Sequence, residues 1–208
     1  MDLLEHAGKR VLAAHGVPVP IGHLAVDIDQ AVAAGDAVGY PVVVKAQVPV
    51  GGRGKAGGIK VATDPASLAE AADAVLGMSI KGHLVRRVWV EEALTAAREC
   101  YFSFTFDRAA KLHLGMLSAR GGVDIEEVAV EFPEAIHRFH VHPLDGFTEA
   151  AAAAAVDAAG ITGDAAEPMA GVLVKLYDAY TAADTELVEV NPLAVVADGR
   201  VLAMDAKV

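Results

Sequence analysis

A glycine-rich, basic segment directly follows a short apolar strand that ends at Lys45. Between Lys45 and Gly58 the sequence places five glycines and three cations, Lys45, Arg53 and Lys55, within fourteen residues. Glycines let backbone N–H groups approach an anion closely, and the cations supply the opposite charge. A lysine on a buried strand needs a partner, and a phosphate is a good one. The segment therefore indicates a phosphate site, with a flexible hairpin loop bearing solvated cations as the alternative.

The glycine-rich segment matches neither the P-loop order nor G-x-G-x-x-G. The predicted elements are a mixture of helices and strands. Helices are predicted at about 3–15, 29–38, 65–76, 148–159 and 166–182, and strands at about 42–45, 59–62, 87–92, 101–106, 111–117 and 186–190. Asp2 and Glu5 have the spacing of a capping box for the first helix. Hairpin turns are expected at 107–110 and 198–199. Hairpins and crossovers together point to a two-lobed α+β or α/β domain rather than a Rossmann repeat.

The composition is that of a folded protein with an acidic surface. Hydrophobic residues make up 54% of the 208 residues, and the formal net charge is -11. An acidic surface argues against nonspecific binding of nucleic acid or of an anionic membrane. Cys100 is the one cysteine, so no internal disulfide can form, which fits a reducing compartment such as the cytoplasm. We expect its thiol to be buried and inert. Neither a signal peptide nor a membrane-spanning run is found.

A second signal is the acidic pair Glu91 and Glu92 at the end of a predicted strand, with Glu99 close behind. A strand end that leads into a short loop, here at Leu94, can act as a hinge between lobes. Backbone groups of such a hinge can bind an adenine edge, and a nearby carboxylate can accept hydrogen bonds from both ribose hydroxyls. Surface carboxylates around a loop are the alternative.

A third signal lies near the end of the sequence. Strand alternation places Glu189 and Asn191 on one face, and Asp205 follows on the next strand of a hairpin. A few hard oxygen ligands, completed by waters and phosphates, are typical of magnesium. Polar residues at strand edges are the alternative. His137, His140 and His142 could suggest zinc, but the sequence shows no fourth ligand for them.

These motifs occur in order across the whole chain, and together they resemble the ATP-grasp domain of the β subunits of ADP-forming succinate–CoA ligases. The residues that carry the resemblance are Lys45, the runs 51–58, 121–126 and 189–193, Glu91, Glu99 and the opening run 18–22. The resemblance implies an α+β ATP-grasp fold with the nucleotide between two lobes. Residues 1–20 and 95–208 would form the larger lobe, and 21–94 the smaller. Pro49 and Arg120 depart from the usual family pattern.

The resemblance also implies roles for particular residues. The nucleotide phosphates would be held by Lys45 and by the backbone of Gly52, Arg53 and Gly54. Glu91 and Leu94 would lie at the adenine hinge and Glu99 at the ribose, and magnesium would be bound by Asn191 and Asp205. The residue type at Pro20 goes with ATP rather than GTP.

The full reaction implied by the resemblance joins succinate to CoA using ATP, through succinyl phosphate and a phosphohistidine. That histidine belongs to the partner α subunit, so no catalytic residue is expected in this chain. The family continues into a second β-subunit domain, which we expect to be absent here. The alternatives are a β chain specific for malate or another acid, and a stand-alone nucleotide-binding module without turnover.

Overall fold

The computed structural model describes residues 3–208, which form two compact units. The smaller unit combines the residues up to His6 with Pro20–Leu94, and the larger combines Ala7–Val19 with Thr95–Val208. Residues 3–6 therefore belong with the smaller unit, whereas the sequence assigned them to the larger lobe. The side chain of Glu5 pairs with Lys45 and Arg53 of the smaller unit, forty or more positions away in the sequence. Within residues 3–208, no helix has both the length and the apolar character needed to span a bilayer.

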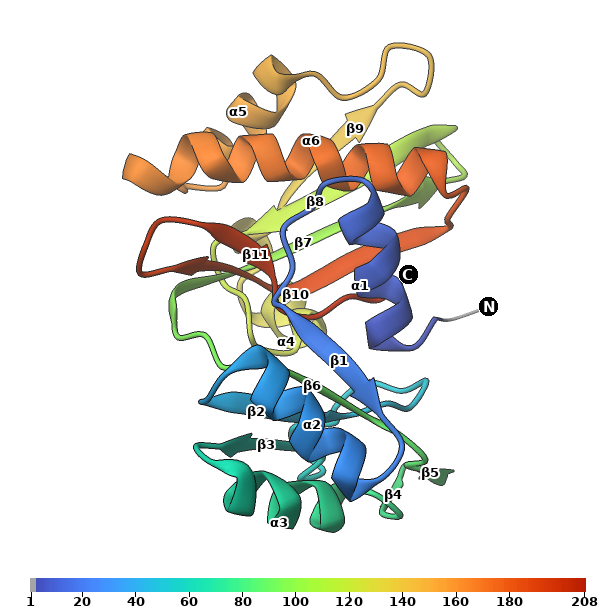
Figure 1. The fold of residues 1–208 in the computed structure, drawn as a ribbon. Coiled ribbons are helices and arrows are strands. Elements are labelled where there is room, and N and C mark those ends of the chain that lie inside the picture. Colours follow the sequence, from blue (N-terminus) through green and yellow to red (C-terminus); the bar gives the residue numbers. More distant parts are fainter. Residues whose placement is uncertain (1–2) are drawn as a thin grey trace. The chain divides into compact units, whose positions relative to one another are not determined.

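The smaller unit is built on a four-stranded antiparallel sheet in the order β1-β6-β2-β3. Helices α2 and α3 pack beside it (Figure 1). Each begins at an aspartate N-cap, Asp27 or Asp64, whose carboxylate accepts a backbone N–H of the first turn. The bounds are β1 Gly22–Ala25, α2 Ile28–Val38, β2 Val42–Ala46, β3 Ile59–Ala62, α3 Pro65–Val75, β4 Ser79–Ile80, β5 His83–Leu84 and β6 Val88–Glu92.

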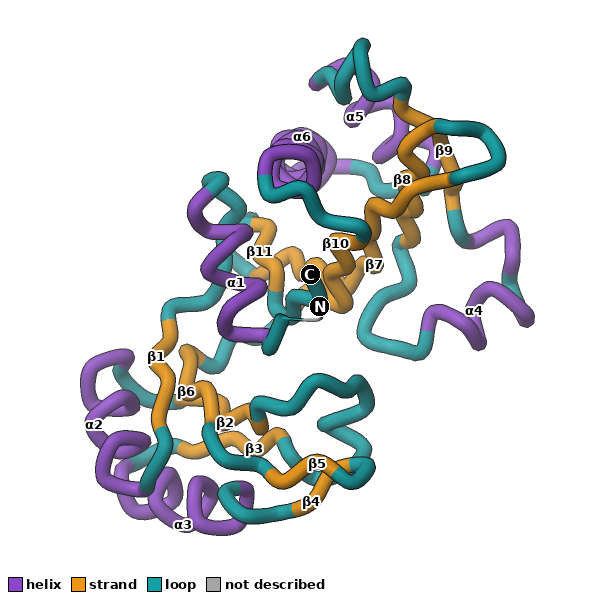
Figure 2. The backbone as a smooth tube through the Cα atoms, turned by 90° about the vertical axis from the view of Figure 1, so that its right-hand side faces the viewer, coloured by secondary structure: helices purple, strands orange, loops and turns teal. Residues whose placement is uncertain are grey.

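The larger unit is built on a five-stranded antiparallel sheet in the order β11-β10-β7-β8-β9. Helices α5 and α6 lie over one face of it (Figure 2). The core there is aromatic, since Phe104 of β7 packs edge-on against Tyr177 of α6 and against Phe147. The bounds are α1 Glu5–Ala14, β7 Ala96–Asp107, β8 Leu112–Ser118, α4 Ile125–Glu131, β9 His137–Val141, α5 Glu149–Ala158, α6 Ala166–Ala182, β10 Leu187–Val196 and β11 Val201–Ala203.

The elements with strong local signals lie where the sequence predicts them. The hairpin between β7 and β8 turns through 108–111, and β10 and β11 pair across the turn that contains Gly199. No local pattern predicted β1, the short β4–β5 hairpin or α4. Strand β1 is only four residues long and exists through its pairing with β6, more than sixty positions away. Asp2 of the expected capping box lies outside the described residues.

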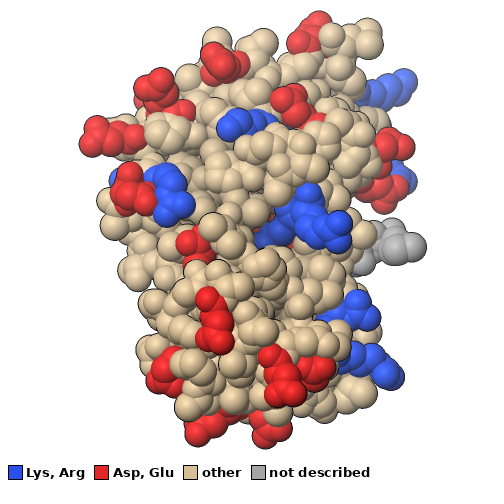
Figure 3. All heavy atoms as spheres, viewed as in Figure 1, with Lys and Arg blue, Asp and Glu red and all other residues tan. Residues whose placement is uncertain are grey.

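Charged side chains are spread over the surface. Acidic side chains gather over α2 and α3, toward the bottom of the face in Figure 3. The sequences of these helices contain Asp29, Asp36, Glu70 and Asp73. This distribution agrees with the net charge of -11.

Candidate functional site

Four charged residues of the smaller unit form a buried cluster, which we call the charge cluster: Glu5, Lys45, Arg53 and Glu91. The Lys45 ammonium lies 3.1 Å from Glu5 Oε1 and also pairs with Glu91 Oε1. The Arg53 guanidinium pairs with Glu5 Oε2 and donates to the carbonyl of Ala46 at 3.1 Å. All four side chains are at most 10% exposed. The cluster therefore joins the start of α1, strands β2 and β6, and the glycine-rich segment.

Neutral side chains complete this arrangement. The indole N–H of Trp89 donates to Glu91 Oε2 at 2.7 Å. The Gln47 amide donates to Glu5 Oε2 at 3.4 Å and to the Lys45 carbonyl at 3.2 Å, while its oxygen accepts from the His6 backbone at 3.0 Å. These bonds fix the carboxylates, because a buried acceptor is satisfied only in a narrow range of positions.

Lys45 has two carboxylate partners in the structure. A buried lysine needs a counter-charge, and the carboxylates of Glu5 and Glu91 supply one. Two carboxylates and two cations sum to zero formal charge, which makes the burial of all four tolerable. A phosphate ligand would join a site in which the cations are already in place.

The glycine-rich segment folds into a series of tight turns. The Gly57 N–H donates to the Gly54 carbonyl and the Gly58 N–H to the Arg53 carbonyl, both at 2.9 Å. Gly52 has φ +78, a left-handed conformation that a residue with a side chain rarely adopts. Gly52 and Gly54 are exposed while Arg53 between them is buried. The segment thus presents backbone and the Lys55 side chain to solvent and turns Arg53 inward.

The two residues expected at the hinge, Glu91 and Leu94, differ in how deeply they are buried. The Glu91 side chain is fully buried and faces Lys45 and Trp89, so it is not a surface carboxylate at a strand end. Leu94 is half-buried just beyond β6. The neighbouring backbone is engaged, since the Ala93 N–H donates to the Pro41 carbonyl at 3.0 Å.

The larger unit contributes a second group of expected site residues, centred on Asn191 of β10. Asn191 Oδ1 accepts the Gly122 N–H at 2.7 Å, and its amide donates to the Val123 carbonyl at 2.8 Å. Glu99 on β7 is exposed, and its carbonyl accepts the Gly121 N–H at 2.9 Å. Gly122 has φ +72, and a Cβ there would collide with the Glu99 carboxylate. Asn191 and Glu99 therefore both contact the pair Gly121–Gly122.

Two acidic side chains of the larger unit, Asp205 and Glu189, interact electrostatically with each other. Asp205 is half-buried, and its carboxylate accepts the Ala206 N–H at 2.8 Å. Glu189 accepts from the Tyr101 hydroxyl at 3.3 Å. Burial raises the pKa of Glu189; Lys207 and the Tyr101 hydrogen bond oppose the shift, and the negative charges of Glu126 and Asp205 add to it. The Asn191 carbonyl oxygen keeps a second lone pair. Asn191 and Asp205 thus both carry oxygen atoms of the kind that magnesium binds.

The same fold and sequence pattern occur in proteins of known family. Residues 2–195 match the ATP-grasp domain family. This chain belongs to the ATP-grasp family.

Relatives of this ATP-grasp chain include the succinate–CoA ligase (GDP-forming) subunit beta of Thermus thermophilus, 49% identical over 208 residues, which are 100% of this chain and 55% of that protein. The succinate–CoA ligase (ADP-forming) subunit beta of Natronomonas pharaonis is 48% identical over 206 residues, covering 99% of this chain and 54% of that protein. The chain therefore spans about half the length of the curated relatives it matches.

Solved structures share the fold at low identity. The dinucleotide-forming acetyl-coenzyme A synthetase 1 of Ca. Korarchaeum cryptofilum, in complex with coenzyme A, Ca-AMPCP and HgCl+, has a TM-score of 0.81 at 19% identity, over 99% of this chain and 92% of that chain. ATP citrate lyase of Methanothrix soehngenii, in complex with citrate and coenzyme A, has a TM-score of 0.77 at 18% identity, over 100% of this chain and 50% of that chain. At these identities the likeness shows the fold.

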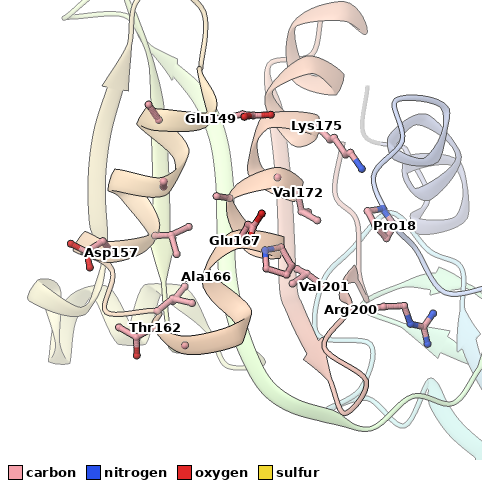
Figure 4. Close-up of a pocket in the computed structure, with 18 residues that line it drawn as sticks. Pro18, Glu149, Asp157, Thr162, Ala166, Glu167, Val172, Lys175, Arg200 and Val201 are labelled. Atoms are coloured by element: carbon pink, nitrogen blue, oxygen red, sulfur yellow. The ribbon is translucent and has the colours of Figure 1, made fainter.

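A cavity of about 1110 Å³ in the larger unit lies apart from the expected site residues. It opens between α5 and α6, near the turn that carries Arg200 (Figure 4). Glu149, Asp157 and Glu167 line it together with Lys175 and Arg200. None of the residues that the sequence assigned to nucleotide or metal is among its lining residues.

Two of the clustered histidines contact neighbouring side chains, and the cysteine is buried. His140 Nε2 lies 2.9 Å from the Asp107 carboxylate, and His137 stacks on Phe139. Within residues 3–208 there is no group of three or more His, Cys, Asp or Glu placed to hold a metal, so the histidines give no support to a zinc site. Cys100 is fully buried, and burial raises its thiol pKa to about 11, which confirms an inert thiol.

The sequence marks Glu5 only as part of a capping box, and Glu189 was not among the expected magnesium ligands. No local pattern links Glu5 to its partner Lys45, which is forty positions away. Glu189 was placed on the face of Asn191, but its burial and its contact with Tyr101 depend on pairing between distant strands.

Proposed function

We propose that this ATP-grasp chain is the nucleotide-binding part of the β subunit of an ADP-forming succinate–CoA ligase. The relatives at 48–49% identity carry that name or its GDP-forming counterpart. In the complete enzyme, succinate would be joined to CoA using ATP, by way of succinyl phosphate and a phosphohistidine on a partner α subunit. The cytoplasm, where ATP is available and a lone thiol stays reduced, is the proposed location.

The observation that carries the proposal is the charge cluster. In a family defined by the ATP-grasp domain, it brings Lys45 of β2 and Arg53 of the glycine-rich segment onto one carboxylate, Glu5. Two cations held together suit a polyphosphate, because neighbouring phosphate oxygens can then be contacted at once. The exposed backbone of Gly52 and Gly54 adds N–H donors to the same segment.

The remaining residues take roles that follow from their chemistry. Leu94 and the backbone after Glu91 would contact the base, and the exposed Glu99 carboxylate would accept from the ribose hydroxyls. Asn191 and Asp205 would hold magnesium, which, when bound, offsets the negative charge of the phosphates. The work of this chain is positioning and charge stabilisation, with no covalent step of its own.

The decisive test supplies the proposed partner. The protein is mixed with a purified succinate–CoA ligase α subunit and ATP labelled on the γ-phosphate, and label on an α-subunit histidine is measured. We expect transfer that requires both chains and magnesium, and succinyl-CoA when succinate and CoA are added. Nucleotide binding without transfer to any α subunit would contradict the proposal and favour a stand-alone binding module. Turnover with malate but not succinate would assign a different acid.

The base is a separate question, because the relatives include both GDP-forming and ADP-forming enzymes. We propose ATP, supported by the residue type at Pro20. Competition between ATP and GTP for the same protein tests this point. A preference for GTP would leave the ligase proposal intact and overturn only the choice of base.

A further inference from the structure

Glu5 contacts two cations that come from different parts of the smaller unit. Its Oε1 lies 3.1 Å from the Lys45 ammonium on β2, and its Oε2 pairs with the Arg53 guanidinium on the glycine-rich segment. The Gln47 amide donates to the same Oε2 at 3.4 Å. One carboxylate therefore uses both of its oxygens to join a strand to a loop.

The ordinary role of an acid at this place in a helix does not account for these contacts. A glutamate at the first helical residue stabilises the helix dipole from the solvent side. Glu149, the first residue of α5, is such a residue and is exposed. The Glu5 side chain is 1% exposed, although burying a carboxylate costs free energy unless it is paired. The pairing of the Glu5 carboxylate with the two cations therefore accounts for its buried position.

We propose that Glu5 is a positioning residue that holds the Lys45 ammonium and the Arg53 guanidinium at one point, so that both contact the nucleotide phosphates. The inference rests on the proposed function, in which Lys45 and Arg53 bind those phosphates. Nothing in the family resemblance drawn from the sequence assigns a role to Glu5.

The two cations differ in how strongly they depend on Glu5. Lys45 lies on a central strand of the sheet and pairs with Glu91 as well. Arg53 lies in a segment of tight turns between exposed glycines, and besides Glu5 it contacts the neutral carbonyl of Ala46 at 3.1 Å. Like charges repel strongly in a poorly solvated site. Without the negative charge of Glu5, the Arg53 guanidinium is the group that moves toward water, and the two-cation contact is lost.

A double-mutant cycle on Mg-ATP affinity tests the proposal, with dissociation constants measured by calorimetry. Glu5→Gln keeps the size of the side chain and removes its charge. We expect it to weaken binding about tenfold in the otherwise unchanged protein, as for a lost charge-assisted contact. In an Arg53→Ala background the two-cation contact is already absent, so Glu5→Gln should weaken Mg-ATP binding by less than about twofold.

Glu149→Gln is the matched control, since it makes the same chemical change at the first residue of another helix. It should leave the affinity unchanged. Glu5→Asp covers the case in which Glu5→Gln does not fold: it keeps the charge but is one methylene too short to reach both cations. It should fold and bind Mg-ATP several-fold more weakly.

The outcomes separate this inference from the proposed function. If Lys45→Ala and Arg53→Ala both leave Mg-ATP affinity unchanged, the phosphate assignment is wrong and the role of Glu5 falls with it. If those variants weaken binding but Glu5→Gln and Glu5→Asp do not, only the positioning role is wrong. An equal effect of Glu5→Gln in both backgrounds would show a general structural role and would also overturn the proposal.

Discussion

The two units hold their candidate residues in opposite ways. In the smaller unit these residues are charged side chains, at most 10% exposed, that neutralise one another within the charge cluster. In the larger unit Asn191 and Asp205 are oxygen donors fixed by backbone N–H and carbonyl groups, and Glu99 is exposed. One arrangement depends on charge balance between side chains, and the other depends on hydrogen bonds to loops.

The difference predicts how each group responds to damage. A buried charge that loses its partner keeps its desolvation cost, so the charge cluster should be sensitive to any change of charge. Residues fixed by neutral hydrogen bonds lose less when one bond is removed. The same substitution should therefore be far more destabilising in the smaller unit than in the larger.

The largest effect is expected from Glu91→Ala compared with Glu99→Ala. Glu91 is fully buried against Lys45 and Trp89, so its removal should lower the free energy of unfolding by about 3–5 kcal/mol. Glu99 is exposed, and its removal should change that free energy by no more than about 0.5 kcal/mol. Urea unfolding of both variants measures the difference. Similar losses in the free energy of unfolding for the two variants would show that the two units do not differ in this way.

A smaller effect is expected from Asn191→Ala. The substitution removes both hydrogen bonds to the loop at Gly122 and Val123, which should lower the free energy of unfolding by about 1–2 kcal/mol. Val130→Ala, at a side chain that is 83% exposed, serves as the control in the same unfolding experiment. A loss as large as that of Glu91→Ala would mean that the larger unit also depends on a buried network.

Local patterns in the sequence predicted much of this fold. The β7–β8 and β10–β11 hairpins, and the start of α3 at Asp64, follow from turn and capping residues close in sequence. The charge cluster and the loop held by Asn191 could not be found this way. Their contacts join Lys45 to Glu5 across forty positions and Asn191 to Gly122 across sixty-nine. The residue types were visible in the sequence, but their partners depend on the tertiary fold.

The smallest effect concerns Glu189 and pH. Burial raises the pKa of this carboxyl above its ordinary value of 4.5, so the folded state holds its proton more tightly than the unfolded state does. The ionised group therefore costs stability at neutral pH, and the cost disappears as the pH falls through the raised pKa toward 4.5.

Glu189→Gln imitates the protonated group at every pH. It should raise the midpoint of thermal unfolding at pH 7.5 by roughly 2 °C, and the gain over the unchanged protein should vanish near the ordinary pKa. Thermal scans of both proteins across this range provide the check. A variant that is less stable at neutral pH would show that the contacts with Tyr101 and Lys207 outweigh the cost of burial.

We propose that Lys45 binds the nucleotide phosphates and that Asp205 binds the magnesium ion that accompanies them. Calorimetric titration with ATP, with and without magnesium, of the unchanged protein, Lys45→Ala and Asp205→Asn tests both roles. We expect Lys45→Ala to weaken binding under both conditions by roughly 1.5–3 kcal/mol, the worth of a charge-assisted contact. We expect Asp205→Asn to weaken binding only when magnesium is present. Unchanged ATP affinity in Lys45→Ala, or an equal loss with and without magnesium in Asp205→Asn, would contradict these roles.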